Sequence, residues 1–178
     1  FTVAQATDYH VSPPSGFSIS YLNTAIEQTA TDLYVSQWGS DSNSGTSPET
    51  PLKTIQYAYS IIYPDSSNRR TIHLADGVYS PSTTGEVFPV GLMEYVSIQG
   101  ESQMGTILDA EGTERVMDVI DVHGNTISNL TLRGGLPSGN STHYWERNSG
   151  GGIRLINTSI GISNVNILGC SANRSGGG

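Results

Sequence analysis

The chain has 178 residues, of which 35% are hydrophobic and 13% charged, and it contains 21 glycines. This length fits one domain with a sizeable core, and the composition is typical of an all-β chain with many turns. The net charge of −8, with Lys53 as the single lysine, argues against nucleic-acid partners and anionic membrane surfaces, because both bind basic patches. No apolar run is long enough to insert into a membrane as a helix.

Residues 1–31 contain the stretch VSPPSG and are expected to form an extended N-terminal arm that can dock on a neighbouring molecule. Residues 32–70 are expected to form a cap made of a strand, a loop and a helix. Asp32–Ser36 alternates polar and apolar residues, as a short strand does. In the loop that follows, Asp41 and Asn43 resemble part of a calcium loop, but the later glutamate of such a loop is missing, so turn capping is favoured.

A short amphipathic helix is expected from about Pro51 to Ile62. Thr50 fits the N-cap and Pro51 the first helical position. An apolar stripe then runs from Leu52 to Ile62 at spacings of three and four residues. We expect this helix to close the first coil of the region that follows and to cover its apolar core and unpaired strand edges.

Residues 71–178 consist of short strand-like runs broken by Gly or Asn. Ile127–Gly134 and Ile162–Gly169 match position by position at an offset of 35 residues, and Met93–Gly100 fits the same template at an offset of 34. Strand-sized runs that repeat at this period predict a right-handed parallel β-helix, a solenoid whose inward Ile, Leu and Val side chains stack in ladders. A β-sandwich is the alternative, but sandwiches lack such in-register repeats. The last repeat is interrupted at SANRSGGG.

Asn129 and Asn164 occupy equivalent places just before the apolar triplet of each repeat. Asparagines at the corner of a β-helix can stack and bond backbone groups that the bend leaves unpaired, so a structural ladder is expected here. In the earliest repeat, the offset of 34 places Tyr95 at this position and Ile98 over Leu132.

Four short motifs follow one another near the start of the chain. They are Tyr34-Val35, the loop from Gly39 to Pro51, Thr54-Ile55 with Ala58, and Asp76-Gly77-Val78-Tyr79. This series resembles the N-terminal region of secreted β-helix proteins of the pectate-lyase-like superfamily, and the similarity extends from about Leu33 to Gly134. The resemblance implies a parallel β-helix fold. It leaves the function open, because the superfamily includes polysaccharide lyases and hydrolases as well as surface proteins and adhesins.

Uronate lyases of this superfamily use a basic residue and often Ca²⁺ held by carboxylates. From Thr71 onward the chain carries five arginines and no lysine. Asp118 with Asp121 is the candidate pair for Ca²⁺ or catalysis, and Asp109 with either of them is the candidate pair for a hydrolase. Aspartates on an exposed strand are, however, usually only solvated. His73 and His123 are expected at the surface, without metal-ligand spacing. We therefore expect no catalytic residue, no cofactor and no metal site in this chain, with Ca²⁺ as the one ion to consider.

The insertion from Leu136 to Gly151 interrupts the repeat and places an aromatic pair beside charged side chains. Such a loop can stack on a sugar ring and bond its hydroxyls; alternatively its tryptophan packs back on the coil. The candidate ligand-binding residues are His143, Tyr144, Trp145, Glu146 and Arg147. Asn-x-Ser/Thr sequons make candidate glycosylation sites of Asn129, Asn140, Asn157 and Asn173. Cys170, alone at a strand end, is expected to act as a small buried hydrophobe.

These patterns predict an extracellular or cell-surface β-helix protein with a structural, adhesive or glycan-binding role. Its expected partners are copies of itself, joined end to end or through the arm, or an extracellular polysaccharide. The alternative is the N-terminal part of a polysaccharide lyase or hydrolase whose active site lies downstream. The acidic charge favours the first prediction, because an acidic surface repels polyuronates unless Ca²⁺ bridges them.

Overall fold

The computed structural model describes residues 28–137 and 149–172, and this part of the chain is mostly β with one short helix. The elements in chain order are β1 (Leu33–Val35), α1 (Ile55–Ile61), β2 (Arg70–Leu74), β3 (Gly77–Tyr79), β4 (Val90–Gly91), β5 (Val96–Gly100), β6 (Thr106–Asp109), β7 (Met117–Ile120), β8 (His123–Arg133), β9 (Ile153–Ile156) and β10 (Ser159–Leu168).

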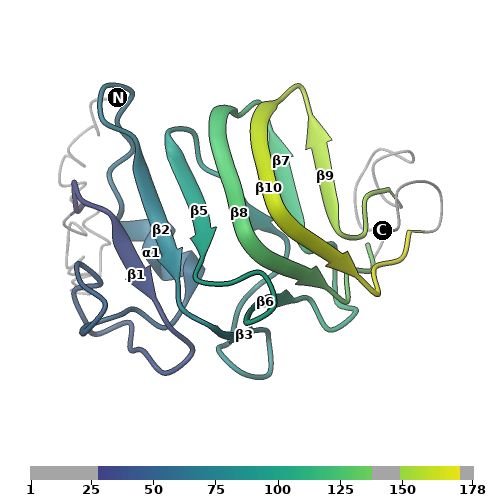
Figure 1. Ribbon diagram of the computed structural model, residues 1–178, viewed down its shortest axis with the longest axis horizontal. Helices are drawn as coiled ribbons and strands as arrows, with labels where there is room; N and C mark the ends of the chain where they lie inside the picture. Colours follow the sequence, from purple (N-terminus) through teal and green to yellow (C-terminus); the bar gives the residue numbers. More distant parts are fainter. Residues whose placement is uncertain (1–27, 138–148, 173–178) are drawn as a thin grey trace, which may run out of the picture.

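Two parallel sheets contain all of these strands. The larger sheet has the order β1-β2-β5-β8-β6-β3, with β10 paired to β8, and the smaller has the order β4-β7-β9. The larger sheet curls because β8 pairs with β5 through its first half and with β6 through its second half. Figure 1 shows β2, β5, β8 and β10 side by side, with β7 and β9 behind them. This arrangement is compatible with a β-helix.

The core lies inside this curl and is built from rows of aliphatic side chains in register. One row contains Leu33, Ile72, Ile98 and Ile127, all with 0% of their surface exposed. Alternate residues of each strand face inward, so β2 shows the burial pattern buried, half-buried, buried. Burying each such side chain contributes about 1.5–3 kcal/mol to folding.

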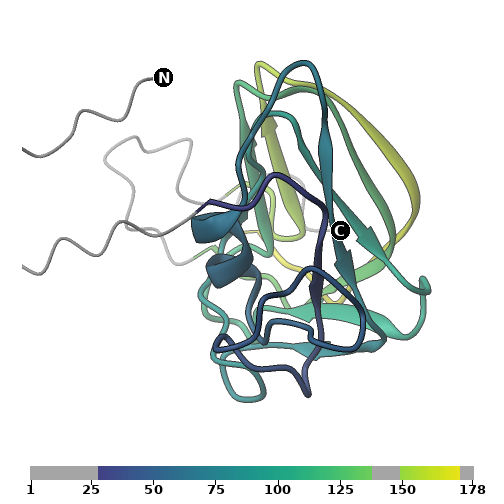
Figure 2. The same ribbon diagram turned by 90° about the vertical axis from the view of Figure 1, so that its left-hand side faces the viewer.

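The helix α1 is shorter than the sequence predicts. It begins after the N-cap Thr54, whose side chain accepts a hydrogen bond from the Tyr57 N–H. Pro51 and Leu52 are not helical, because Leu52 forms a parallel bridge with Val35 of β1. Figure 2 shows α1 beside the first strands, where it buries one face against the core. The helix therefore starts at Ile55 and not near Pro51.

The free edge of β1 is paired by the loop and not by the helix. Tyr34 N–H donates to the Gly45 carbonyl at 2.7 Å, and Leu52 N–H donates to the Tyr34 carbonyl at 2.8 Å. Gly39 makes this loop course possible, since a Cβ there would lie 2.1 Å from the Leu52 carbonyl oxygen. Asp41 fixes the loop to the helix, because its carboxylate accepts hydrogen bonds from Lys53 N–H and Thr54 N–H at 2.9 and 3.0 Å. Asp41 therefore has a capping role, but it bonds N–H groups 12 and 13 residues further along the chain and not those of its own turn.

The register of the earliest repeat differs from the prediction. Ile98 pairs with Ile127, five residues before the predicted partner Leu132, because the connection from β5 to β8 is shorter than that from β8 to β10. The predicted offset of 35 does hold between β8 and β10, where Ile127 pairs with Ile162.

Because of this shift, the residue of the earlier coil that lies beside Asn129 and Asn164 is not the predicted one. Asn164 Nδ2 donates to Asn129 Oδ1 at 2.9 Å, which is the contact that the predicted ladder requires. Both residues have positive φ angles, 56° for Asn129 and 53° for Asn164, a conformation that asparagine tolerates better than most residues. Gly100 lies against the Asn129 carbonyl, so Gly100 precedes the pair, and Tyr95 occupies a different corner, before β5.

Candidate functional site

A row of outward-facing side chains crosses the larger sheet from β1 to β10. In register order these residues are Tyr34, His73, Gln99, Ser128 and Ser163. They alternate with the buried aliphatic residues of the same strands, so they stand on the outer face of the curl. The aromatic residues lie at the β1 end of the row.

Two rings of this row stack on each other. The ring centroids of Tyr34 and His73 are 4.9 Å apart and the ring planes differ by 19°. Asp32 holds the imidazole in place, because its Oδ2 lies 3.1 Å from His73 Nε2. The other oxygen of Asp32 accepts a hydrogen bond from Thr71 N–H at 2.9 Å. The stacked pair is therefore a preformed aromatic surface with a carboxylate at its edge.

A groove of about 380 Å³ passes over this aromatic surface. The volume lies within the range of small-molecule pockets, about 300–1,000 Å³. Prolines of the loop after β1 border it, and the exposed side chains of Gln99 on β5 and Glu101 just after β5 continue it. The lining residues are Tyr34, Val35, Ser36, Pro48, Pro51, His73, Leu74, Ala75, Gln99, Gly100 and Glu101. Trp38, two residues beyond the groove residue Ser36, is 85% exposed.

The chemistry of the groove suits a partly apolar ring that carries hydroxyl groups. Tyr34 and His73 turn one ring face toward each other, so each offers its outer face and its edge, while Gln99 offers both donors and acceptors. Asp32 and Glu101 add negative charge. Such a combination suits a neutral sugar better than an anionic one, because a carboxylate ligand would be repelled.

A second polar cluster lies at the start of α1. Glu86 is only 2% exposed, and its Oε1 accepts a hydrogen bond from Ile55 N–H at 2.6 Å. Its Oε2 is buried without a hydrogen-bond partner among the described residues. Burial raises the pKa of Glu86 to about 7, and the nearby Asp41 carboxylate adds to this effect. The cluster fixes the segment before β4 to the helix, and Glu86 is not among the residues that line the groove over Tyr34 and His73.

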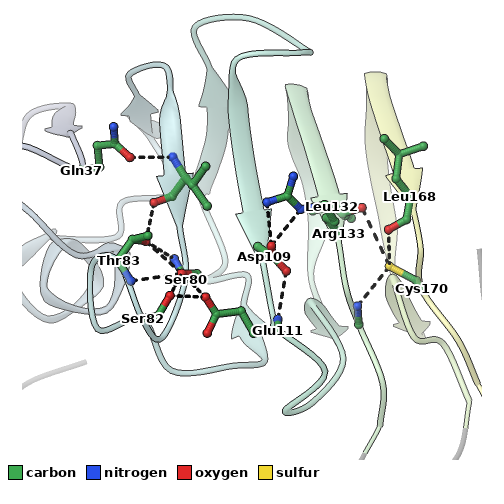
Figure 3. A network of polar contacts seen from close by, with 12 residues as sticks. Gln37, Ser80, Ser82, Thr83, Asp109, Glu111, Leu132, Arg133, Leu168 and Cys170 are labelled. Carbon is green, nitrogen blue, oxygen red and sulfur yellow. Dashed lines mark hydrogen bonds and ion pairs between the residues drawn. The ribbon is translucent and has the colours of Figure 1, made fainter.

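The acids that the sequence marks as candidates each have a separate partner. Arg133 Nε donates to Asp109 Oδ2 at 2.8 Å, and Arg154 Nε donates to Asp118 Oδ1 at 2.7 Å. Asp121 accepts a hydrogen bond from Asn157 Nδ2 at 2.6 Å. Figure 3 shows the Asp109 pair beside the cluster that joins Glu111 to Ser80 and Ser82. These contacts tie neighbouring strands together and do not bring the three aspartates to one point.

No group of three or more His, Cys, Asp or Glu side chains within residues 28–137 and 149–172 is arranged to hold a metal ion. In the same ranges no helix is long and apolar enough to cross a membrane. Cys170 is a buried free cysteine, as predicted, and Figure 3 shows its thiol facing the carbonyls of Leu132 and Leu168.

Several predicted residues fall outside the described part of the chain. The insertion residues His143, Tyr144, Trp145, Glu146 and Arg147 lie there, as do the sequons at Asn140 and Asn173. Of the remaining sequons, Asn157 is exposed and Asn129 is half-buried with its side chain bonded to Asn164.

Sequence reasoning missed the groove and two buried polar residues. Tyr34 and His73 are 39 positions apart, and only the β1–β2 register brings them together. Asn125 is 1% exposed; its Nδ2 donates to the carbonyls of Met93 and Val96, and its Oδ1 accepts from Tyr95 N–H. The alternation in LYV and TIHLA was a usable signal for outward aromatic residues, whereas no pattern around Glu86 or Asn125 indicates burial.

The comparisons with known proteins give one result. The chain belongs to the family described as "Protein of unknown function (DUF1565)", which it matches over residues 37–173 and which is associated with β-helix proteins. No curated protein and no solved structure matches the chain.

Proposed function

We propose that this protein is a right-handed parallel β-helix that binds a neutral polysaccharide in the groove over Tyr34 and His73, outside the cell or at the cell surface. The observation that carries the proposal is the stacked aromatic pair, held by Asp32 and open to solvent along the groove. Aromatic ring faces suit the C–H faces of sugars, and the neighbouring amide and carboxylate groups suit their hydroxyls.

The shape and the charge of the surface support the same class of ligand. The groove lies on the outer face of parallel strands, so its floor is fixed by the backbone ladder and the ligand meets a preformed surface. The chain has a net charge of −8. A neutral chain of sugars is therefore favoured over a polyuronate.

The alternative, the N-terminal part of a polysaccharide lyase or hydrolase, has no observation in its favour among the described residues. Asp109 and Asp118 are each bound by an arginine of a neighbouring strand, so they hold the fold together and do not form an acid pair open to substrate.

Affinity electrophoresis and calorimetric titration with soluble neutral polysaccharides, with polygalacturonate as the acidic comparison, test the proposal. We expect Tyr34→Ala to weaken binding about fivefold to tenfold, since an aromatic contact contributes roughly 1 kcal/mol. The matched control is Tyr63→Ala, because Tyr63 is 48% exposed and does not border the groove. Equal binding by the two variants, or binding of polygalacturonate alone, would contradict the proposal.

A further inference from the structure

Asp32 restricts where the His73 imidazole carries its hydrogen. Its Oδ2 lies 3.1 Å from His73 Nε2, and its Oδ1 accepts a hydrogen bond from Thr71 N–H at 2.9 Å. The second bond fixes the carboxylate against β2. A carboxylate accepts hydrogen bonds and does not donate them, so a neutral imidazole makes this contact only with its hydrogen on Nε2. The lone pair of the neutral ring is therefore on Nδ1.

The second ring nitrogen of His73, Nδ1, is an open hydrogen-bond acceptor. Among the described residues the ring bonds only Asp32, through Nε2, and Nδ1 is not enclosed by the protein. Tyr34 stacks on one face of the ring, whereas both nitrogens lie at its edge. His73 lines the groove, with 30% of its side chain exposed. A ligand in the groove can therefore donate a hydrogen bond to Nδ1.

The other polar side chains of the groove add acceptors more than donors. Glu101 is exposed, and its Oε2 already accepts a hydrogen bond from Asp76 N–H at 3.0 Å. Gln99, which pairs with His73 in register, can donate or accept. Among the described residues that line the groove there is no lysine or arginine. The groove therefore suits a ligand that brings hydrogen-bond donors of its own.

We propose that the groove recognises an N-acetylated amino sugar whose amide N–H donates to His73 Nδ1, and that Asp32 is the positioning residue for this selection. An amide N–H can only donate, so it distinguishes the two tautomers of the ring, whereas a hydroxyl can donate or accept and does not. The acetamido group is uncharged, and its methyl group suits an aromatic surface. This inference rests on the proposed glycan binding and names the sugar.

Protonation of His73 reverses the role of Nδ1. The imidazolium carries a hydrogen on both nitrogens, so Nδ1 would meet the amide N–H as a second donor. The titratable side chains around the ring are Asp32, Tyr34 and Glu101. Carboxylates are ordinarily ionised and phenols protonated between pH 5 and 8, the range in which an imidazole ordinarily titrates. The preference for an N-acetylated sugar is therefore present at pH 8 and lost as the pH falls to 5.

Calorimetric titration of the full chain at pH 8 and pH 5 tests the selection. The probes are the tetramers of N-acetylglucosamine and of glucose with the same linkage, which differ only in bearing an acetamido group in place of one hydroxyl per sugar. We expect the N-acetylglucosamine tetramer to bind about tenfold more tightly at pH 8 and about equally at pH 5. The glucose tetramer is the internal control, because a change of the fold with pH, such as one through Glu86, acts on both ligands.

Asp32→Asn tests the positioning role. Asparagine keeps an oxygen for Thr71 N–H but can offer an N–H to His73 Nε2, which moves the ring hydrogen to Nδ1. We expect the variant to lose the preference at pH 8. Nitrogen NMR of the ligand-free protein with labelled histidines is expected to show the hydrogen on Nε2 in the natural protein and on Nδ1 in the variant, with the signal assigned by its loss in His73→Gln. Asp65→Asn is the matched control, since Asp65 bonds Ser67 N–H outside the groove.

The outcomes separate this inference from the proposed glycan binding. A hydrogen on Nδ1 in the natural protein overturns the inference alone. Equal binding of the two tetramers at pH 8, or a preference that persists at pH 5 or in Asp32→Asn, does the same. If neither tetramer binds while another neutral polysaccharide does, the inference again fails alone, and if no neutral polysaccharide binds, both proposals fail.

Discussion

Replacing Glu86 by glutamine is expected to change how the stability of the protein depends on pH. Glu86 is 2% exposed and holds the first N–H of α1 through a single oxygen, while its other oxygen has no partner among the described residues. Glutamine keeps an acceptor for Ile55 N–H but carries no charge. The substitution therefore removes the buried ionisation and leaves the contact with the helix.

The magnitude follows from the pKa of Glu86. Burial raises it from the ordinary value of 4.5 to about 7. At about 1.4 kcal/mol for each tenfold change in proton affinity, ionising Glu86 in the folded state costs about 3 kcal/mol. The pKa of Glu86 is higher in the folded state than in the unfolded state. The stability that the folded protein has with Glu86 protonated is therefore fully present below pH 4.5 and is lost as the pH rises through about 7. We expect Glu86→Gln to match the natural protein near pH 4.5 and to exceed it by up to about 3 kcal/mol at pH 8.

Urea unfolding followed by circular dichroism at pH 5, 6, 7 and 8 measures the difference. Histidines elsewhere titrate in the same way in both proteins, so their contribution cancels when one free energy of unfolding is subtracted from the other. Glu49→Gln serves as the control, because a hydrogen bond with Ser47 holds the pKa of the exposed Glu49 carboxyl below its usual range, so it stays ionised in this window. Parallel pH profiles for the natural protein and Glu86→Gln would refute the reasoning.

Three other substitutions or reagents probe the cap and the last coil. Asp41→Ala is expected to lower the free energy of unfolding by about 2 kcal/mol, since its carboxylate caps two backbone N–H groups, and a change near zero in urea unfolding would count against the cap. Gly39→Ala is expected to lower the unfolding midpoint markedly, because the added Cβ would lie against the Leu52 carbonyl. Gly91→Ala is expected to be tolerated, because the nearest atom to an added Cβ there is the Asp118 carbonyl oxygen at 3.9 Å, and equal effects of the two substitutions would contradict this. Burial raises the pKa of Cys170, so alkylation with iodoacetamide is expected to be slow in the folded protein and fast in urea, and rapid native labelling would show the thiol to be open.

The sequence predicts the parts of the fold that depend on local chemistry or on repeats of equal length. A capping role for Asp41 could be expected from its residue type, although the N–H groups that it caps lie 12 and 13 residues further along. The pairing of Ile127 with Ile162 follows from the offset of 35 between the two repeats. The pairing of Ile98 could not be predicted in this way. The similarity of Met93–Gly100 to the later repeats indicates an offset of 34, but a coil changes length at its loops without disturbing its strands, so similarity of pattern selects Leu132 where the structure has Ile127.

The candidate site was less accessible to sequence reasoning than the fold. The aromatic surface depends on the register between β1 and β2, which brings Tyr34 beside His73 across an intervening loop and helix. The burial of Glu86 also depends on tertiary packing, because a glutamate in a turn of Ser, Thr and Gly residues is ordinarily solvated. Both features come from long-range contacts. Alternation marks Tyr34 and His73 as outward-facing, but residue type and spacing do not show that the two rings meet or that Glu86 is buried.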